Sequence, residues 1–284
     1  DFLGMTVVAG NVGMDLTAKN ACIICDWAGE EDFPVYAGAV KPLLRELETA
    51  EAVHGKTGLD GTALHEPRCP LQKQHAVAYL VETLSRAEDA SITLCPIGPL
   101  TNIALALSIA PEAVRAIKRI VLMGGNYFEA GNMTPAAEFN FFTDPHAAQI
   151  VLQSGAPITV LPLDVTHKAQ ITSKRMNRLR RLKNANGSRL ADILQSYERF
   201  DIQQFGLEGG PLHDPCAVIC AVFPELFSGR MCRVDVETQS GLSTGACAVD
   251  WHGTTGKTPN ALWITEVDAD RMFEELTAAI AELP

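Results

Sequence analysis

Residues 123–145, MGGNYFEAGNMTPAAEFNFFTDP in one-letter code, combine a pair of adjacent glycines, a long polar loop and a helix-start signal. The largely apolar residues 119–123 at their beginning are typical of a buried strand. Gly124 and Gly125 end that strand and let another group approach its carboxyl end. Because ligands of parallel α/β sheets bind beyond the carboxyl ends of the strands, we expect this loop to hold a ligand.

Three polar side chains of the loop, those of Asn132, Glu138 and Asn140, can bind the neighbouring hydroxyl groups of a sugar. In an extended segment Glu138 and Asn140 point to one side, because alternate residues of a strand share a face. The alternative is a plain surface loop, and it already accounts for Asp144 and Pro145 as the N-cap and first residue of a helix. We expect the first three residues to form a sugar clamp.

The rest of the chain alternates between strand and helix patterns, which predicts a single α/β domain over residues 1–284. The predicted strands cover residues 3–11, 33–37, 91–97, 119–123 and 158–165, and the predicted helices cover 15–27, 74–86, 145–154, 190–205 and 268–283. Two further runs, 233–237 and 245–250, predict an antiparallel pair near the sheet edge. The expected fold is an open, mainly parallel sheet flanked by helices, with a small antiparallel extension.

The amino-acid composition indicates which kinds of binding partner to expect. The chain has 284 residues, of which 47% are hydrophobic, and a formal net charge of -11. We expect no nucleic-acid partner, because affinity for a phosphate backbone comes from an excess of Lys and Arg. We also expect no membrane association, because no apolar stretch is long enough to cross a bilayer. A small neutral molecule or a bound cation fits this composition better.

The eight cysteines lie mostly in apolar runs, as small core residues do in a reducing compartment. We therefore expect a cytoplasmic protein. Cys22 and Cys25 form a Cys-x-x-Cys pair, but they lie within a helical pattern with no second pair nearby. We interpret them as core residues rather than as a redox or zinc motif.

Two other loops carry candidate residues. His54 lies in the polar, glycine-rich segment 53–61, where it is either solvated or directed at a ligand. The turn at residues 98–102 exposes backbone carbonyl groups, and we expect Thr101 or Asn102 to cap the next helix.

The triplet His213-Asp214-Pro215 also marks a predicted helix start. It repeats the aspartate-proline pattern of residues 144–145, so a plain N-cap is one interpretation of Asp214. The adjacent histidine favours chemistry, because a histidine can act as a general acid and a carboxylate can bind a metal or a hydroxyl group.

Taken together, these segments resemble the inosine-uridine preferring nucleoside hydrolases. The matching segments occur in the family's order over nearly the whole chain: residues 7–11, 53–55, 97–102, 123–125, 131–140 and 213–215. The segment between Asn132 and Asn140 is the most specific of them. The resemblance implies a Rossmann-like nucleoside hydrolase fold, with a calcium ion at the strand ends.

The resemblance also implies hydrolysis of the N-glycosidic bond of purine or pyrimidine ribonucleosides to free base and ribose. Calcium would hold the ribose 2′ and 3′ hydroxyl groups and the attacking water. The transition state of such a reaction needs anionic oxygen near the sugar and a protonated leaving group. The implied partner is a small-molecule nucleoside, and relatives of this kind form homodimers or homotetramers.

Residue roles follow from the same resemblance. The metal ligands would be the carbonyl oxygen of Ile97 and the carboxylate of Asp214, and the ribose ligands Asn132, Glu138 and Asn140. Asn11 would orient the catalytic base, and His213 would protonate the departing nucleobase. The base pocket would be lined by His54, Phe139, Tyr197 and Trp251.

The sequence departs from the family at one point. The family opens with a strand and helix carrying a DxDPGxDD motif, which supplies most calcium ligands and the aspartate base, and residues 1–284 do not contain it. We expect these residues to lack the family's first strand and helix, and to be inactive without them. Two alternatives remain: a ribose- or nucleoside-binding protein without catalysis, and a metal-independent hydrolase that uses His213 and Asp214 as an acid-base pair.

Overall fold

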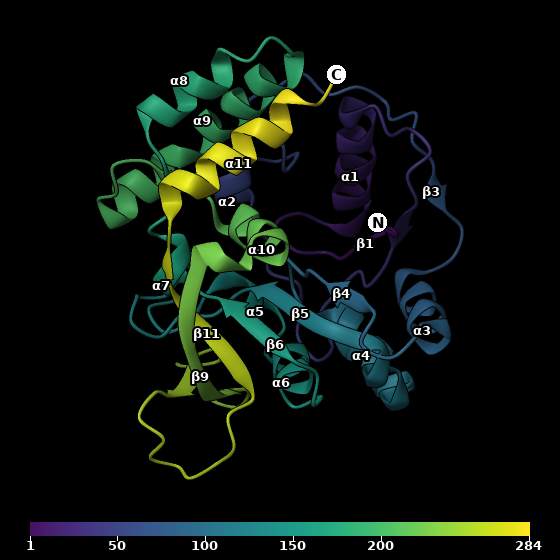
Figure 1. Cartoon of the computed structure of the whole chain (residues 1–284), viewed down its shortest axis with the longest axis vertical. Coiled ribbons are helices and arrows are strands. Elements are labelled where there is room, and N and C mark those ends of the chain that lie inside the picture. The colour runs from purple at the N-terminus through teal and green to yellow at the C-terminus, as the bar shows by residue number, and fades with distance from the viewer.

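The computed structural model describes the backbone of residues 1–284 and the side chains of residues 1–196 and 206–284. It confirms the α/β class, with strands and helices alternating along most of the chain (Figure 1). The largest sheet has six strands in the order β10-β9-β11-β6-β5-β4. These are β4 (Ile92–Leu94), β5 (Ile117–Met123), β6 (Ile158–Leu161), β9 (Phe227–Val236), β10 (Cys247–Asp250) and β11 (Ala261–Val267).

The four neighbouring strands β4, β5, β6 and β11 pair in parallel, so their carboxyl ends lie at one edge of the sheet. At the other side of the sheet, β9 pairs antiparallel with both β10 and β11. The predicted antiparallel extension at residues 233–237 and 245–250 is confirmed by the β9–β10 pair.

Five short strands lie outside the six-stranded sheet. β1 (Met5–Val7), β2 (Val35–Ala37) and β3 (Leu71–Gln72) form a separate parallel sheet, and β7 (Gln170–Ile171) and β8 (Gly210–Pro211) form a two-stranded one. In the described chain β1 and β4 are therefore edge strands. The expected open, mainly parallel sheet flanked by helices, with a small antiparallel extension, is confirmed.

Asn102 connects the two larger sheets. Its Nδ2 donates to the carbonyl of Val7 in β1 at 2.9 Å, and its Oδ1 accepts from the backbone N–H of Ala39 at 2.8 Å. The expectation that Asn102 or Thr101 caps α4 (Thr101–Ile109) was wrong, because Leu100 occupies the N-cap position. The amide of Asn102 instead satisfies backbone groups of the smaller sheet.

The helices are α1 (Met14–Ala28), α2 (Glu51–His54), α3 (Ala76–Arg86), α4 (Thr101–Ile109), α5 (Phe139–Thr143), α6 (Pro145–Leu152), α7 (Leu163–Thr166), α8 (Ser173–Arg180), α9 (Ala185–Phe205), α10 (His213–Val222) and α11 (Ala269–Ala281), with 3-10 helices at Pro111–Ala116 and Pro224–Leu226. One predicted strand, 158–165, was too long. It ends at Leu161, and Pro162 is the N-cap of α7. Proline favours this helix start because its fixed φ and missing N–H suit the first turn.

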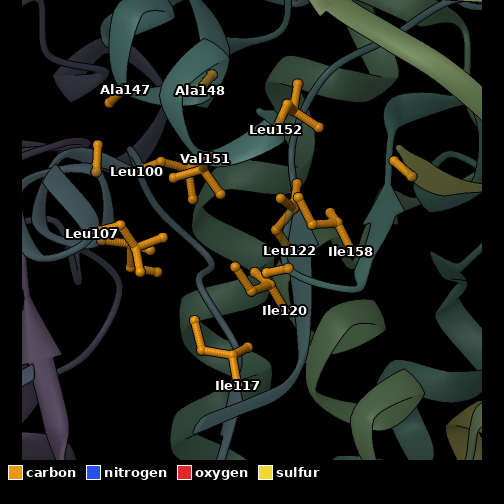
Figure 2. Packing of buried hydrophobic residues seen from close by; sticks show 14 of the residues in the cluster. Leu100, Leu107, Ile117, Ile120, Leu122, Ala147, Ala148, Val151, Leu152 and Ile158 are labelled. Atoms are coloured by element: carbon orange, nitrogen blue, oxygen red, sulfur yellow. The ribbon is translucent and has the colours of Figure 1, made fainter. Parts of the chain in front are cut away.

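Helices cover both faces of the six-stranded sheet. In Figure 1, α10 and α11 lie above β5 and β6, whereas α4 and α6 lie below. Along β5, Ile120 and Leu122 pack with α3, α4 and α6, while Val121 and Met123 pack with α8 to α11. Figure 2 shows the first cluster, in which Leu122 of β5 lies among the apolar side chains of α6 and β6. The alternation follows from the two-residue period of a strand.

All eight cysteines are free. Cys22 and Cys25 are buried in α1, and burial raises the pKa of each thiol to about 12. This environment supports their interpretation as core residues. Within the described part of the chain, no helix is both long enough and apolar enough to span a membrane.

Candidate functional site

The loop after β5 is organised by Glu138. Its carboxylate accepts hydrogen bonds from the backbone N–H groups of Gly125 at 2.9 Å, Asn140 at 2.8 Å and Phe141 at 3.1 Å. Glu138 is thus the N-cap of α5, and residues 138–140 are not the extended segment that we expected. Its side chain is 2% exposed, and burial raises its pKa to about 7.

Gly125 permits this arrangement. Its φ of +79° lies in the left-handed region that favours glycine. A Cβ atom there would lie 2.8 Å from Sγ of Cys247 and 3.1 Å from the ring of Trp263. The glycine that ends β5 therefore lets the loop turn back tightly enough for its N–H to reach Glu138.

The other two clamp residues belong to the same network. Oδ1 of Asn132 accepts a hydrogen bond from the N–H of Phe139 at 2.9 Å. Nδ2 of Asn140 donates to the carbonyl of Met123 at 3.2 Å and lies 3.5 Å from the carbonyl oxygen of Ile97. The network therefore joins the end of β5 to the turn after β4, as expected for residues at one sheet edge.

His213 begins α10 and faces other polar side chains. Its Nδ1 lies 2.7 Å from Oγ1 of Thr166, and its ring centroid lies 5.8 Å from that of His167. Burial lowers the pKa of His213 to about 3, and electrostatic repulsion from His167 and His54 acts in the same direction. The fold thus brings His54 and His213, which are far apart in the sequence, into one environment.

Asp214 lies in the first turn of α10, but it is not the N-cap, because Leu212 occupies that position. The plain-cap interpretation was therefore wrong. Burial raises the pKa of Asp214 to about 7, and the carboxylate of Glu138 contributes to the shift. This electrostatic interaction places the start of α10 near the clamp network.

The structure gives fewer contacts for the predicted base-pocket residues than for the clamp residues. Phe139 is buried at the start of α5, and the ring of Trp251, just after β10, lies 5.1 Å from that of Phe128. The side chain of Tyr197 lies outside the described residues. Asn11 lies between β1 and α1, where its carbonyl accepts from the N–H of Ala50 at 2.9 Å. Among the described side chains, no contact joins Asn11, Phe139 and Trp251 in one pocket.

A cavity of about 650 Å³ lies in another part of the molecule, beside residues such as Arg119, Gly155 and Arg233. None of the predicted site residues lines it. The candidate site is therefore defined by its side chains at the carboxyl edge of the parallel strands.

The described residues do not form a complete calcium site. Calcium takes six to eight oxygen ligands, and the predicted ligands Ile97 and Asp214 offer one carbonyl and one carboxylate. Among residues 1–196 and 206–284, no three histidine, cysteine, aspartate or glutamate side chains group closely enough to hold a metal ion. We assign no catalytic step to calcium on this basis.

Two polar residues at this edge were missed in the sequence. Asp164 accepts hydrogen bonds from the backbone N–H groups of residues 127–129, each at 3.0 Å, and from Nε1 of Trp263 at 2.8 Å. Thr166 contacts His213. A signal existed for Thr166, because it directly follows the predicted buried strand 158–165. Asp164 lies within that predicted strand, so no such signal existed for it.

Comparison with known proteins identifies the family. The sequence model of the family described as "Inosine-uridine preferring nucleoside hydrolase" matches residues 1–274. The chain belongs to this family. The resemblance inferred from the motifs at Asn132–Asn140 and His213 is thereby confirmed.

Relatives agree with this nucleoside hydrolase over nearly its whole length. An uncharacterised protein of Schizosaccharomyces pombe is 45% identical over 100% of this chain and 92% of its own length. A pyrimidine-specific ribonucleoside hydrolase from Shewanella is 45% identical over 98% of this chain and 87% of its own. Among solved structures, a purine-preferring ribonucleoside hydrolase from Gardnerella vaginalis superposes with a TM-score of 0.91 at 30% identity, covering 99% of this chain and 90% of its own.

Proposed function

We propose that this nucleoside hydrolase cleaves the N-glycosidic bond of ribonucleosides, with a preference for pyrimidine nucleosides. In the reaction the bond between C1′ and the base nitrogen breaks, and the base leaves with the electron pair and gains a proton. The hydroxyl group of one water molecule is added to C1′. The products are free base and ribose.

The observation that supports the proposal is the position of the clamp network: Nδ2 of Asn140 donates to the carbonyl of Met123 at the end of β5 and lies 3.5 Å from the carbonyl oxygen of Ile97. Glu138 interacts electrostatically with Asp214, and its cap network includes Asn140 and, through Phe139, Asn132. Amide and carboxylate groups of this kind can orient ribose hydroxyl groups.

His213 would supply a hydrogen to the departing base. A positioned general acid of this kind typically contributes a factor of about 10² to 10⁴ in rate. His54 shares its environment and would line the base side of the site, with Phe139, Tyr197 and Trp251. Asn11 would orient the group that activates water.

The preference for pyrimidines is supported by relatives. Several proteins that are 43% to 46% identical to this chain are named pyrimidine-specific ribonucleoside hydrolases. The structural neighbour named as purine-preferring is only 30% identical. We therefore expect uridine or cytidine to be hydrolysed faster than inosine.

Three finer features also belong to the proposal. Calcium would assist, with Ile97 and Asp214 among its ligands, and the family resemblance implies a homodimer or homotetramer. A cytoplasmic location agrees with eight free cysteines. Removal of divalent ions with a chelator should therefore lower activity.

The test is a reducing-sugar assay on uridine, cytidine and inosine, with and without chelator, using protein expressed from the full coding sequence. We expect activity that is greatest on a pyrimidine nucleoside, lost with chelator and lowered at least about 100-fold by His213→Ala. His75→Ala is the matched control, because His75 caps α3 and belongs to none of the proposed roles.

Other outcomes would contradict parts of the proposal. Tight binding of uridine without release of uracil would indicate a binding protein and overturn hydrolysis. Full activity in chelator would overturn the role of calcium, and faster hydrolysis of inosine would overturn the pyrimidine preference.

A further inference from the structure

Thr166 contacts His213 in a way that its position in a helix does not explain. A buried helical threonine or serine usually bonds a carbonyl three or four residues earlier. The buried Thr277 does so with the carbonyl of Phe273 at 2.6 Å. Thr166 instead directs Oγ1 to Nδ1 of His213, 47 residues later, at 2.7 Å.

The backbone around Thr166 accounts for this difference. The carbonyl of Pro162, four residues earlier, already accepts hydrogen bonds from the N–H groups of Val165 and Thr166, both at 3.1 Å. The hydroxyl group is therefore available for another partner. Thr166 is fully buried, so water does not supply that partner.

The same region holds the His213 ring in place. The N–H of Leu212 donates to the carbonyl of Ala169 at 2.9 Å, next to the antiparallel pair β7–β8. This short ladder ties the end of α7 to the start of α10. Thr166 and His213 therefore meet across a backbone connection that fixes their separation.

The direction of the hydrogen bond between Thr166 and His213 follows from which buried group would otherwise lack a partner. The contact with His213 is the one hydrogen bond of Oγ1 of Thr166 found in the described part of the chain. If Nδ1 of His213 carried the hydrogen, the hydroxyl hydrogen of Thr166 would be buried without an acceptor, which is costly. The hydroxyl therefore donates and Nδ1 accepts. In the neutral ring, the hydrogen must then be on Nε2.

We propose that Thr166 is a positioning residue that holds His213 in the tautomer with hydrogen on Nε2, on the opposite side of the ring from Thr166. This inference rests on the proposed function, in which His213 supplies a hydrogen to the departing base. Nε2 is then the atom that faces the leaving group. Thr166 does not touch the substrate and acts only through His213.

The first experiment needs no variant and no activity. Nitrogen-15 chemical shifts of the His213 ring, measured at neutral pH in the full-length protein, distinguish the two tautomers. We expect an acceptor-type Nδ1 and a hydrogen-bearing Nε2. Hydrogen on Nδ1 alone, or on both nitrogens, would overturn the assignment.

The second experiment compares Thr166→Val, which removes the hydroxyl at nearly constant volume, with Thr166→Ser, which keeps it. For uridine, Thr166→Val should lower kcat by about 10- to 100-fold and change KM by less than about threefold. Thr166→Ser should retain kcat within about threefold. On 4-nitrophenyl riboside, whose leaving group needs no proton, Thr166→Val should lose less than about threefold.

Thr277→Val is the matched control, because it removes another buried hydroxyl, in α11, and should leave both rates unchanged. Equal losses on the two substrates, or failure of Thr166→Ser to preserve kcat, would overturn the positioning role. If the wild-type protein released no base from uridine, the proposed function would fail, and the nitrogen-15 spectrum would still decide the tautomer.

Discussion

Substitution of Asp164 by alanine should destabilise the protein far more than loss of an ordinary surface carboxylate. Its Oδ1 accepts from three consecutive N–H groups, those of residues 127–129, each at 3.0 Å. Its Oδ2 accepts from Nε1 of Trp263 at 2.8 Å. Asp164 is 4% exposed and Trp263 is fully buried, so water cannot replace the second interaction.

The four hydrogen bonds of Asp164 differ in how much their removal lowers the free energy of unfolding. A hydrogen bond to a charged group contributes about 1.5–3 kcal/mol, and a buried donor without an acceptor costs a similar amount. The indole N–H of Trp263 therefore accounts for about 2–3 kcal/mol of the loss. The loop N–H groups can reach water, because Phe128 is 60% exposed, and we assign them about 1–2 kcal/mol together. Asp164→Ala should lower the free energy of unfolding by about 3–5 kcal/mol.

Urea unfolding at neutral pH measures this difference. Asp270→Ala is the matched control, because the Asp270 side chain is 92% exposed and forms a surface ion pair with Arg175 at 2.5 Å. That variant should lose less than about 1 kcal/mol. A loss below about 1 kcal/mol for Asp164→Ala would refute the reasoning, since it would mean that the four hydrogen bonds contribute no more than a surface ion pair.

Two further predictions concern other polar contacts. The pKa of Asp235 is lowered to about 2, chiefly by a hydrogen bond from Arg233; this interaction stabilises the fold above pH 3.8 and is lost as the pH falls through 2. Asp235→Asn should therefore cost about 2 kcal/mol at pH 6 and clearly less at pH 3, and a cost independent of pH in urea titrations would contradict this assignment. Asn102→Leu should cost about 1–3 kcal/mol, because it removes the side-chain partner of the partly buried carbonyl of Val7 and N–H of Ala39; a thermal melt unchanged from wild type would contradict it.

Local signals in the sequence predicted part of the structure well. Asp144 was expected to cap a helix that begins at Pro145, and its carboxylate accepts from the N–H of Ala147 at 3.0 Å. The same two-residue pattern at Asp214-Pro215 was misleading, because α10 begins at His213, two residues before Pro215. A dipeptide does not fix the helix start when the preceding residues, here the strand β8, determine where the chain turns.

The sequence predicted those residues of the candidate site that come soon after the end of a strand. Asn132, Glu138 and Asn140 follow the end of β5 as expected, but the sequence did not predict that Glu138 caps α5 and that Asn140 lies in this helix, because the cap depends on how Gly125 folds back. The contact between Thr166 and His213 spans 47 residues. The hydrophobic periodicity of the sequence does not predict this contact, because the contact forms only when β7 and β8 pair.

The central claim is that these side chains surround a ribonucleoside that water cleaves. Proton NMR of uridine incubated with the full-length protein in phosphate-free buffer tests it directly. We predict that uracil and ribose form in equal amounts, at a rate proportional to protein concentration. Uridine that remains intact, or uracil that forms only when phosphate is added, would contradict the claim.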